Sequence, residues 1–306
     1  MGNNLSNKLK KSTPSPSINM QEDPDFRFIN GRRYHNFESI KYPLPNDDDE
    51  VDRLHQQHFL LRYVWQRNFA SPIKHVLNQK GTKVLDVGCG AGSWIFEMAS
   101  NYPNTQFTGV DISPIQPTEI KPRNVDFVKA NLLNGLPFED NTFDYIFQRF
   151  LFLAIPKDSW PVIINELTRV LKPGGYLELV EINPTPFQTG PVTDQLFSAG
   201  DLRQRGLDPE IVYKLRSYFE KQENLENVIE EKNKLPYGPE TGKLGQAAAE
   251  NTRLGFSHAK PFLQKDLNIS SEEYDNRLDI VVKELREFGT YHDICCVYAR
   301  KTQFSY

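Results

Sequence analysis

From Val84 to Ser93 the chain reads VLDVGCGAGS, the run of residues that is most informative about the architecture. Its first four residues favour a β-strand apart from one acid, and they run directly into three glycines at alternate positions. Glycine has no Cβ, so a loop of this kind accepts positive φ angles and lets a bound molecule approach the backbone closely. Apolar residues then recur at helical spacing to Ala99, with Ser93 as the expected N-cap. The stretch therefore predicts a strand, a glycine loop and a helix.

An acid ends the next predicted strand, which runs from Gln106 to Val110 and is followed by Asp111. A glycine loop at one strand end and a carboxylate at the next are the two halves of a nucleotide-type site, because the carboxylate can accept hydrogen bonds from a ribose diol. Dinucleotide binders favour G-x-G-x-x-G, whereas the third glycine here, Gly92, comes one residue early. Asp86 also lies two residues before the first glycine. The spacing disfavours a nicotinamide dinucleotide.

These residues resemble motif I of the class I methyltransferases that use S-adenosylmethionine, and Asp111 resembles their ribose-binding acid. The run LPFEDNTFDYIF, residues 136 to 147, is similar to the segment that leads into the fourth strand of small-molecule methyltransferases. The run LKPGGYL, residues 171 to 177, matches a turn signature of the same family. The resemblance implies an α/β fold, namely a doubly wound, mostly parallel seven-stranded sheet with an antiparallel last strand, a helical N-terminal cap and C-terminal lid insertions.

A subfamily is indicated by the NGRRYH run at residues 30 to 35, the predicted helix through Trp65 and the LKPGG signature. Together they resemble fungal methyltransferases related to trans-aconitate methyltransferases and to the velvet-complex regulator of secondary metabolism. We therefore expect in-line transfer of a methyl group from S-adenosylmethionine to an oxygen, nitrogen or carboxylate of a small molecule. Two alternatives stay open: a regulatory protein that keeps the fold and acts through protein partners, and an NAD-dependent oxidoreductase.

The resemblance also implies roles for single residues. The glycine loop should face the methionine end of the cofactor, Asp86 should organise that loop and Asp111 should hold the ribose. Asn131, where the family often has an aspartate, should read adenine through its amide. Arg62, on the predicted helix that contains Trp65, is a candidate for pairing with the methionine carboxylate. The full expected cofactor-binding set is Asp86, Gly88, Cys89, Gly90, Gly92, Asp111, Ile112, Asn131, Leu132, Gln148 and Arg62.

Catalysis requires little beyond alignment, because the sulfonium is already an excellent leaving group and positioning lowers the barrier. A carboxylate acceptor would need no base, whereas an amine or hydroxyl would benefit from a nearby proton acceptor. The candidates are His35, Glu181 and His292.

Composition limits the partners. The formal net charge is −4 with a pI near 5.9, so no broad basic field is available for nucleic acid. Three cysteines give no disulfide framework, and Cys295 and Cys296 should point to opposite faces of a strand, which argues against a shared metal. His55 and His58 share a helix face but have no third ligand in view. These features predict a metal-free cytoplasmic protein.

The N-terminus carries a possible membrane signal. Met1 to Ser6 matches the N-myristoylation pattern with Gly2 as the acceptor, followed by Lys8, Lys10 and Lys11. One acyl chain with neighbouring lysines supports only reversible membrane association, and a disordered tail is the alternative.

The predicted organisation has four parts. Residues 1–27 are a tail, 28–80 an N-terminal cap segment with helices, 81–182 the S-adenosylmethionine-binding core, and 183–303 the lid helices and final strands. Residues 28 to 45 are expected to be ordered without a strand or a helix. Residues 241 to 288 should form two helices with a break near Asn268, and Asp293 to Arg300 the last strand.

Overall fold

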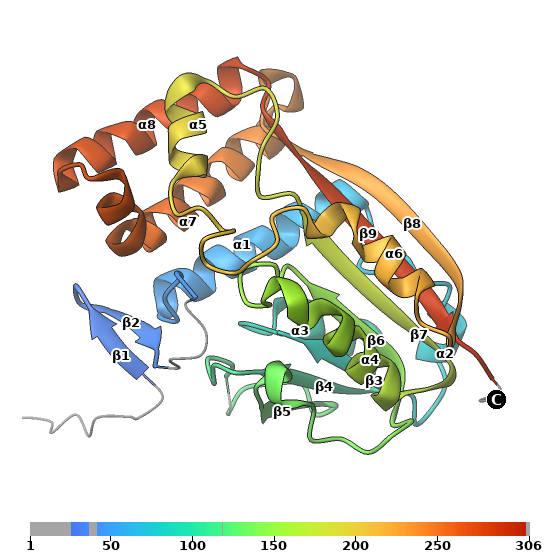
Figure 1. Ribbon diagram of the computed structural model, residues 1–306. Helices are drawn as coiled ribbons and strands as arrows, with labels where there is room; N and C mark the ends of the chain where they lie inside the picture. Colours follow the sequence, from blue (N-terminus) through green and yellow to red (C-terminus); the bar gives the residue numbers. More distant parts are fainter. Residues whose placement is uncertain (1–25, 37–41, 118, 304–306) are drawn as a thin grey trace, which may run out of the picture.

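The computed structural model describes residues 26–36, 42–117 and 119–303. Its central element is a seven-stranded sheet with the strand order β5-β4-β3-β6-β7-β9-β8 (Figure 1). The strands from β5 to β7 pair in parallel, and β9 is antiparallel to both β7 and β8. The predicted doubly wound, mostly parallel sheet is confirmed. Its strands are β3 (Lys83–Val87), β4 (Gln106–Asp111), β5 (Val125–Lys129), β6 (Phe143–Arg149), β7 (Leu171–Ile182), β8 (Leu225–Pro236) and β9 (Tyr291–Lys301).

Helices cover both faces of the sheet. Because side chains alternate along a strand, Val84 of β3 belongs to a buried cluster shared with α2 and α3, whereas Leu85 belongs to a second cluster shared with α4 and α6. The helices are α1 (Asp48–Trp65), α2 (Lys74–Leu77), α3 (Ser93–Asn101), α4 (Trp160–Val170), α5 (Pro191–Ser198), α6 (Leu215–Glu220), α7 (Lys243–Leu267) and α8 (Ser271–Glu287). Short 3₁₀ turns are η1 (Leu132–Asn134), η2 (Lys157–Ser159), η3 (Ile211–Tyr213) and η4 (Pro239–Thr241).

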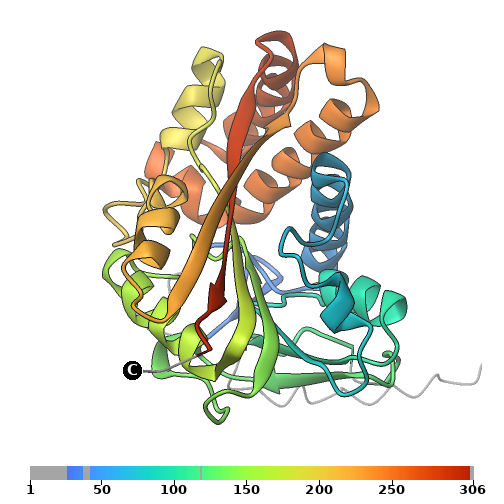
Figure 2. The same ribbon diagram turned by 90° about the vertical axis from the view of Figure 1, so that its right-hand side faces the viewer.

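A helical layer formed by α5, α7 and α8 lies beyond one edge of the sheet, and the long strands β8 and β9 run up to it (Figures 1 and 2). Helix α1 packs against α7 and also against α3, so it joins this layer to the sheet. In β9, Cys295 and Cys296 fall in different core clusters, which confirms that they point to opposite faces.

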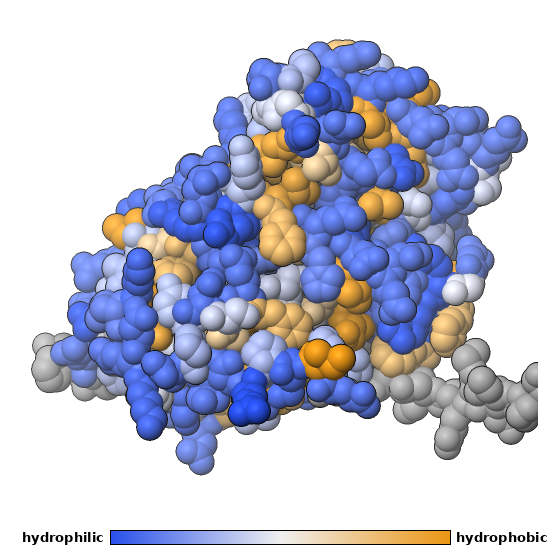
Figure 3. Space-filling view, turned by 180° about the vertical axis from the view of Figure 1, so that it is seen from behind, coloured by the Kyte–Doolittle hydropathy of each residue, from blue (hydrophilic) through white to orange (hydrophobic). Residues whose placement is uncertain are grey.

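The back of the molecule is mainly hydrophilic, with hydrophobic residues in separate patches (Figure 3). The exposed large hydrophobic side chains come from several elements, for example Phe28 of β1, Phe59 of α1 and Ile280 of α8.

Two local predictions were wrong. Residues 28 to 45 were expected to lack strands, but β1 (Phe26–Ile29) and β2 (Arg32–His35) form an antiparallel hairpin. Its turn is Asn30-Gly31, both with positive φ, which is a strong hairpin signal that the aromatic and basic composition obscured. Ser93 is the first residue of α3 and Gly92 its N-cap, because the Ser93 hydroxyl instead contacts Nδ1 of His55 at 2.7 Å.

Other local predictions were right. The predicted helix through Trp65 is confirmed as α1, which begins at Asp48 and is capped by the Asp47 side chain, since this accepts a hydrogen bond from Glu50 N at 3.2 Å. Helices α7 and α8 are separated at Asn268, which has φ 52°. The myristoylation pattern at Gly2 and the lysines after it lie outside the described residues. Among residues 26–36, 42–117 and 119–303, no helix combines the length and apolar character needed to cross a membrane.

Candidate functional site

A cavity of about 410 Å³ opens at the carboxyl ends of the parallel strands, the edge where open α/β sheets bind their ligands. Its floor is formed by strand ends, and its roof by α1, α7 and the segments around residues 42–46 and 197–205. Most of the lining is apolar. Strand-end residues that line the cavity are Gly88, Gly90, Asp111, Ile112, Asn131, Leu132, Arg149 and Ile182.

The glycine loop needs glycine for two physical reasons. Gly88, Gly90 and Gly92 have φ angles of 66°, 52° and 82°, a region that residues with a Cβ rarely adopt. A Cβ on Gly88 would also lie 2.4 Å from Cδ2 of Leu151. The loop is fixed to β4, because Gly88 N and Cys89 N both donate to the Val110 carbonyl, at 2.8 and 3.2 Å. The backbone of the loop is therefore presented to the cavity in a defined shape.

Asp111 joins the loop to the end of β4. One carboxylate oxygen accepts from Gly90 N and the other from Ser113 N, each at 2.9 Å. Burial raises the pKa of Asp111, while hydrogen bonds from the backbone N–H groups of Ser113, Gly90 and Ile112 oppose this. The half-buried carboxylate lines the cavity, so it remains within reach of a ligand diol.

Behind the loop lie two buried ionisable groups, Asp86 and Arg149. Burial raises the pKa of Asp86 to about 8, and the nearby guanidinium of Arg149 opposes the rise. Burial also lowers the pKa of Arg149 to about 10. Nε2 of His58 donates to the Glu97 carboxylate at 2.8 Å, which leaves Nδ1 as an acceptor for Arg149 Nη2 at 3.2 Å. Arg149 therefore lies at the cavity wall with one nitrogen fixed by a neutral histidine.

The structure brings together only part of the expected cofactor set. Asp86, Cys89, Gly92 and Gln148 are not part of the cavity lining and stand behind it. Gln148 is fully buried, and its Nε2 donates to Glu181 at 3.4 Å. Arg62 lies outside the cavity on α1, where its Nε donates to Glu97 at 2.8 Å. Strand alternation explains the difference between Gln148 and Arg149, since neighbours in a strand face opposite ways.

Asn131 and Leu132 form the cavity wall beyond β5. The Asn131 side-chain oxygen accepts from Leu133 N at 3.0 Å and so caps η1. Ile112 also lines the cavity, from the end of β4. These side chains provide an apolar wall with one amide, a surface suited to a flat heteroaromatic ring.

The three candidate proton acceptors differ in access. His35 and His292 line the cavity, and burial lowers the pKa of each. Glu181 is buried beneath it and accepts from Leu151 N at 2.8 Å and Phe152 N at 3.3 Å. Burial raises the pKa of Glu181 to about 8.

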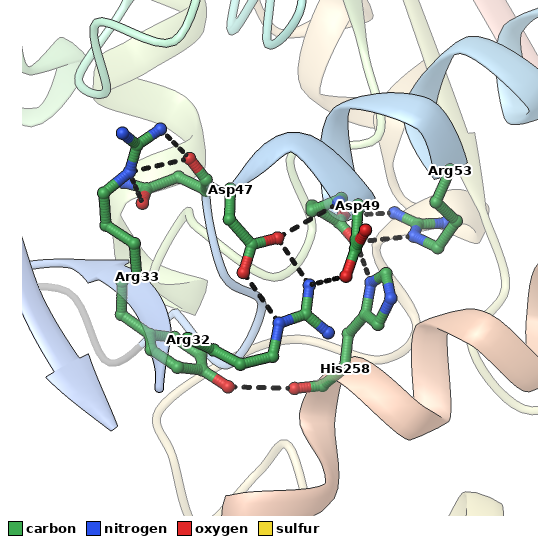
Figure 4. Close-up of polar contacts among 9 residues, drawn as sticks. Arg32, Arg33, Asp47, Asp49, Arg53 and His258 are labelled. Atoms are coloured by element: carbon green, nitrogen blue, oxygen red, sulfur yellow. Dashed lines mark hydrogen bonds and ion pairs between the residues drawn. The ribbon is translucent and has the colours of Figure 1, made fainter. Parts of the chain in front are cut away.

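A buried polar cluster holds the cavity roof (Figure 4). Arg53 donates to both carboxylate oxygens of Glu50, at 2.6 and 2.8 Å, and His258 Nδ1 donates to Glu50 at 2.5 Å. Arg53 also reaches the Asn251 side chain at 3.2 Å, and the Tyr34 hydroxyl donates to the His258 carbonyl at 3.1 Å. The cluster ties β2 and α1 to α7. Sequence reasoning missed it because its partners are about 200 positions apart in the chain.

Within the described part of the chain, no group of three or more His, Cys, Asp or Glu side chains is placed to hold a metal ion.

The core is similar to known proteins. Residues 84–175 match the model of a family described as a methyltransferase domain. A solved structure of a phosphoethanolamine N-methyltransferase from Haemonchus contortus, in complex with phosphomonomethylethanolamine and S-adenosylhomocysteine, superposes with a TM-score of 0.50 at 20% identity. That match covers 87% of this chain and 62% of the other, and it supports the fold.

Curated fungal relatives are more similar in sequence. The methyltransferase pytC of Aspergillus terreus is 37% identical over 158 residues, 51% of this chain and 46% of pytC. The secondary metabolism regulator laeA of Monascus pilosus is 32% identical over 60% of this chain and 49% of its own length. The protein-methionine methyltransferase laeA of Emericella nidulans is 31% identical over 56% of this chain and 46% of its own length. The chain spans about half the length of the curated relatives it matches.

Proposed function

We propose that the chain, whose residues 84–175 match a methyltransferase domain, is an S-adenosylmethionine-dependent methyltransferase that acts on a small molecule. S-adenosylmethionine is the cofactor of this class, as the sequence predicts. One observation carries the proposal: the glycine loop, Asp111 and the apolar roof line a single cavity of about 410 Å³, within the size range of small-molecule sites. A methyl donor and an acceptor would therefore meet in one enclosed space.

The residues present fit the donor. Gly88, Gly90 and the Asp111 carboxylate line the same cavity, so the glycine loop and the acid can contact one ligand. Asp111 would accept hydrogen bonds from the ribose hydroxyls, while Asn131 and Leu132 would contact the adenine. Arg149, rather than Arg62, lies at the cavity wall and is our candidate for the methionine carboxylate.

The acceptor would occupy the part of the cavity under the roof. Its walls there are apolar and include Phe150, Ile182, Phe197 and Phe256. An apolar lining with few polar groups favours a small hydrophobic acceptor that the enzyme aligns with the donor. Excluding water and fixing the line of attack can lower the free-energy barrier by up to about 7 to 11 kcal/mol.

A regulatory role is the second candidate, favoured by the similarity to the secondary metabolism regulator laeA. In that case the chain would bind the cofactor and act on or through a protein partner. An NAD-dependent oxidoreductase is not favoured, because the third glycine comes early and the core matches a methyltransferase domain. The division of the chain into a cap, a core and a lid remains part of the proposal. Membrane association through Gly2 and a cytoplasmic location remain predictions.

Titration calorimetry with S-adenosylmethionine, S-adenosylhomocysteine and NADH tests the proposal. We expect binding of the first two and none of NADH. Asp111→Ala should weaken donor affinity by about 1.5 to 3 kcal/mol, the range for a lost hydrogen bond to a charged group. Asp279→Ala, at an exposed acid on α8, is the matched control and should bind as the wild type does. The proposal fails if the wild-type protein binds NADH instead, or if Asp111→Ala is indistinguishable from the control.

A further inference from the structure

We propose that Nε2 of His292 takes the proton of the methyl acceptor, so that the acceptor is a hydroxyl or amine compound rather than a thioether or carboxylate. This inference rests on the proposed function and names the acceptor class. It follows from the tautomer of His292, its place on the cavity wall and the chemistry of methyl transfer.

The tautomer is fixed by one contact. Nδ1 of His292 lies 2.7 Å from the carbonyl oxygen of Asn183. A carbonyl oxygen can only accept, so Nδ1 must carry the hydrogen and donate it. In a neutral imidazole Nε2 then holds the lone pair. Among the described residues Nε2 of His292 has no hydrogen-bonding partner, and this atom is not completely enclosed by protein atoms.

His292 stands where an acceptor would lie. It is in β9, two residues before Ile294, which pairs with Ile182 at the carboxyl end of β7. In the strand order β3-β6-β7-β9, the strand that contains His292 lies three strand spacings, about 14 Å, from β3, the strand that leads into the glycine loop. That span leaves room for a sulfonium and an acceptor between them. The rings of Phe197 and Tyr237 pack at 5.3 and 5.6 Å from the imidazole and hold it in place.

Burial keeps this imidazole neutral. The residue is 4% exposed, and burial lowers the pKa of His292 to about 4, against smaller opposing effects of the Asn183 carbonyl and Asp293. A base this weak suffices because the proton of an alcohol or amine becomes strongly acidic once its heteroatom begins to bond to the methyl carbon. As the new C–O or C–N bond forms, the C–S bond breaks and its electron pair goes to sulfur, leaving S-adenosylhomocysteine. The proton passes to Nε2 and is then released to water.

The other candidates are less suited to this step. Glu181 does not line the cavity, and its two oxygens already accept from backbone N–H groups. His35 lines the cavity from the hairpin, where its ring packs on Tyr42 at 5.7 Å, but both of its ring nitrogens are enclosed by protein atoms and so are closed to an acceptor in the cavity. A methionine thioether or a carboxylate acceptor has no proton to lose, so a base aimed into the cavity would serve neither.

Nitrogen-15 NMR of histidine-labelled protein reads the tautomer directly. We expect a neutral, Nδ1-protonated imidazole at pH 7, assigned by its disappearance in His292→Asn. In that variant the asparagine amide can still donate to the Asn183 carbonyl, so the fold is kept while the base is lost. His75→Asn, at an exposed histidine of α2, is the matched control. A charged or Nε2-protonated His292 would overturn the inference.

Turnover supplies the second readout, with 2-naphthol, aniline, benzoate and a methionine-containing tetrapeptide as acceptors. We expect methylation of the naphthol or aniline, and a loss in kcat of about 100-fold or more in His292→Asn at unchanged donor affinity. Methylation of benzoate or the peptide alone, or an unaltered kcat in His292→Asn, would contradict the inference. Failure of the wild type to bind S-adenosylmethionine would instead sink the proposed function, while the NMR result would still decide the tautomer.

Discussion

Replacing Glu50 with glutamine should loosen the roof of the cavity. Glu50 is 1% exposed, and its carboxylate receives two hydrogen bonds from Arg53 and one from His258. The Arg53 guanidinium lowers the pKa of Glu50 despite burial, so the group is a carboxylate in the folded protein. Glutamine keeps the size of the side chain but leaves the buried charge of Arg53 uncompensated. Breaking a buried pair in this way costs about 3 to 5 kcal/mol.

The chain contains a matched control for this change. Arg253 and Glu250 form a pair with the same three-residue spacing and the same 2.6 Å contact, but their side chains are 32% and 47% exposed. Solvent screens a surface pair, so Glu250→Gln should cost only about 0.2 to 1 kcal/mol. Comparing the two variants isolates the effect of burial from that of the pair itself.

Urea denaturation of both variants and of the double variant Glu50→Gln/Arg53→Met gives the free energies of unfolding. The double variant should recover a large part of the loss, because replacing both buried charges removes the unpaired one. Donor affinity should fall in Glu50→Gln, since Glu50 and Arg53 line the cavity. A loss in Glu50→Gln no greater than that in Glu250→Gln would refute the reasoning.

Three further changes test the site. Gly88→Ala should lower the free energy of unfolding, measured in a thermal scan, by about 1 to 3 kcal/mol and should abolish detectable donor binding. The reason is that the residue has φ 66° and that a Cβ would lie 2.4 Å from Leu151. A variant as stable and active as the wild type would contradict this. Calorimetry should show donor binding weakened at least tenfold in Arg149→Gln and changed less than twofold in Arg62→Gln. The opposite order would make Arg62 the partner of the methionine carboxylate, as the sequence suggested. The raised pKa of Glu181, about 8, means that the folded state binds a proton that the unfolded state releases above about pH 4.5. The free energy of unfolding of the wild type should therefore fall by a few kcal/mol between pH 4.5 and pH 8, and that of Glu181→Gln should fall less. The same pH dependence in both proteins would refute the raised pKa of Glu181.

The core of the fold was predictable because its signals are local. The strand, glycine loop and helix from Val84 onward are specified by neighbouring residues, and so is the break at Asn268. The hairpin of β1 and β2 was missed although Asn30-Gly31 marked its turn, because short strands rich in arginine and aromatic residues carry a weak alternation. Helix α3 starts one residue earlier than a Ser93 cap would place it, since the Ser93 hydroxyl contacts a histidine of another helix.

The candidate site was predictable only in part. Gly88, Gly90 and Asp111 follow a spacing that sequence shows, and they line the cavity. The choice between Gln148 and Arg149 depends on which face of β6 looks into the cavity, which the sequence leaves open. The Glu50 cluster joins helices far apart in the chain, so only the fold reveals it.

The most direct test of the central claim is a crystal structure of the protein with S-adenosylhomocysteine. We expect the ribose hydroxyls to lie within hydrogen-bond distance of Asp111, with the adenine against Leu132 and the amino-acid end over Gly88. A ligand bound elsewhere, or a cavity that stays without it at saturating concentration, would contradict the claim that this strand edge holds the methyl donor.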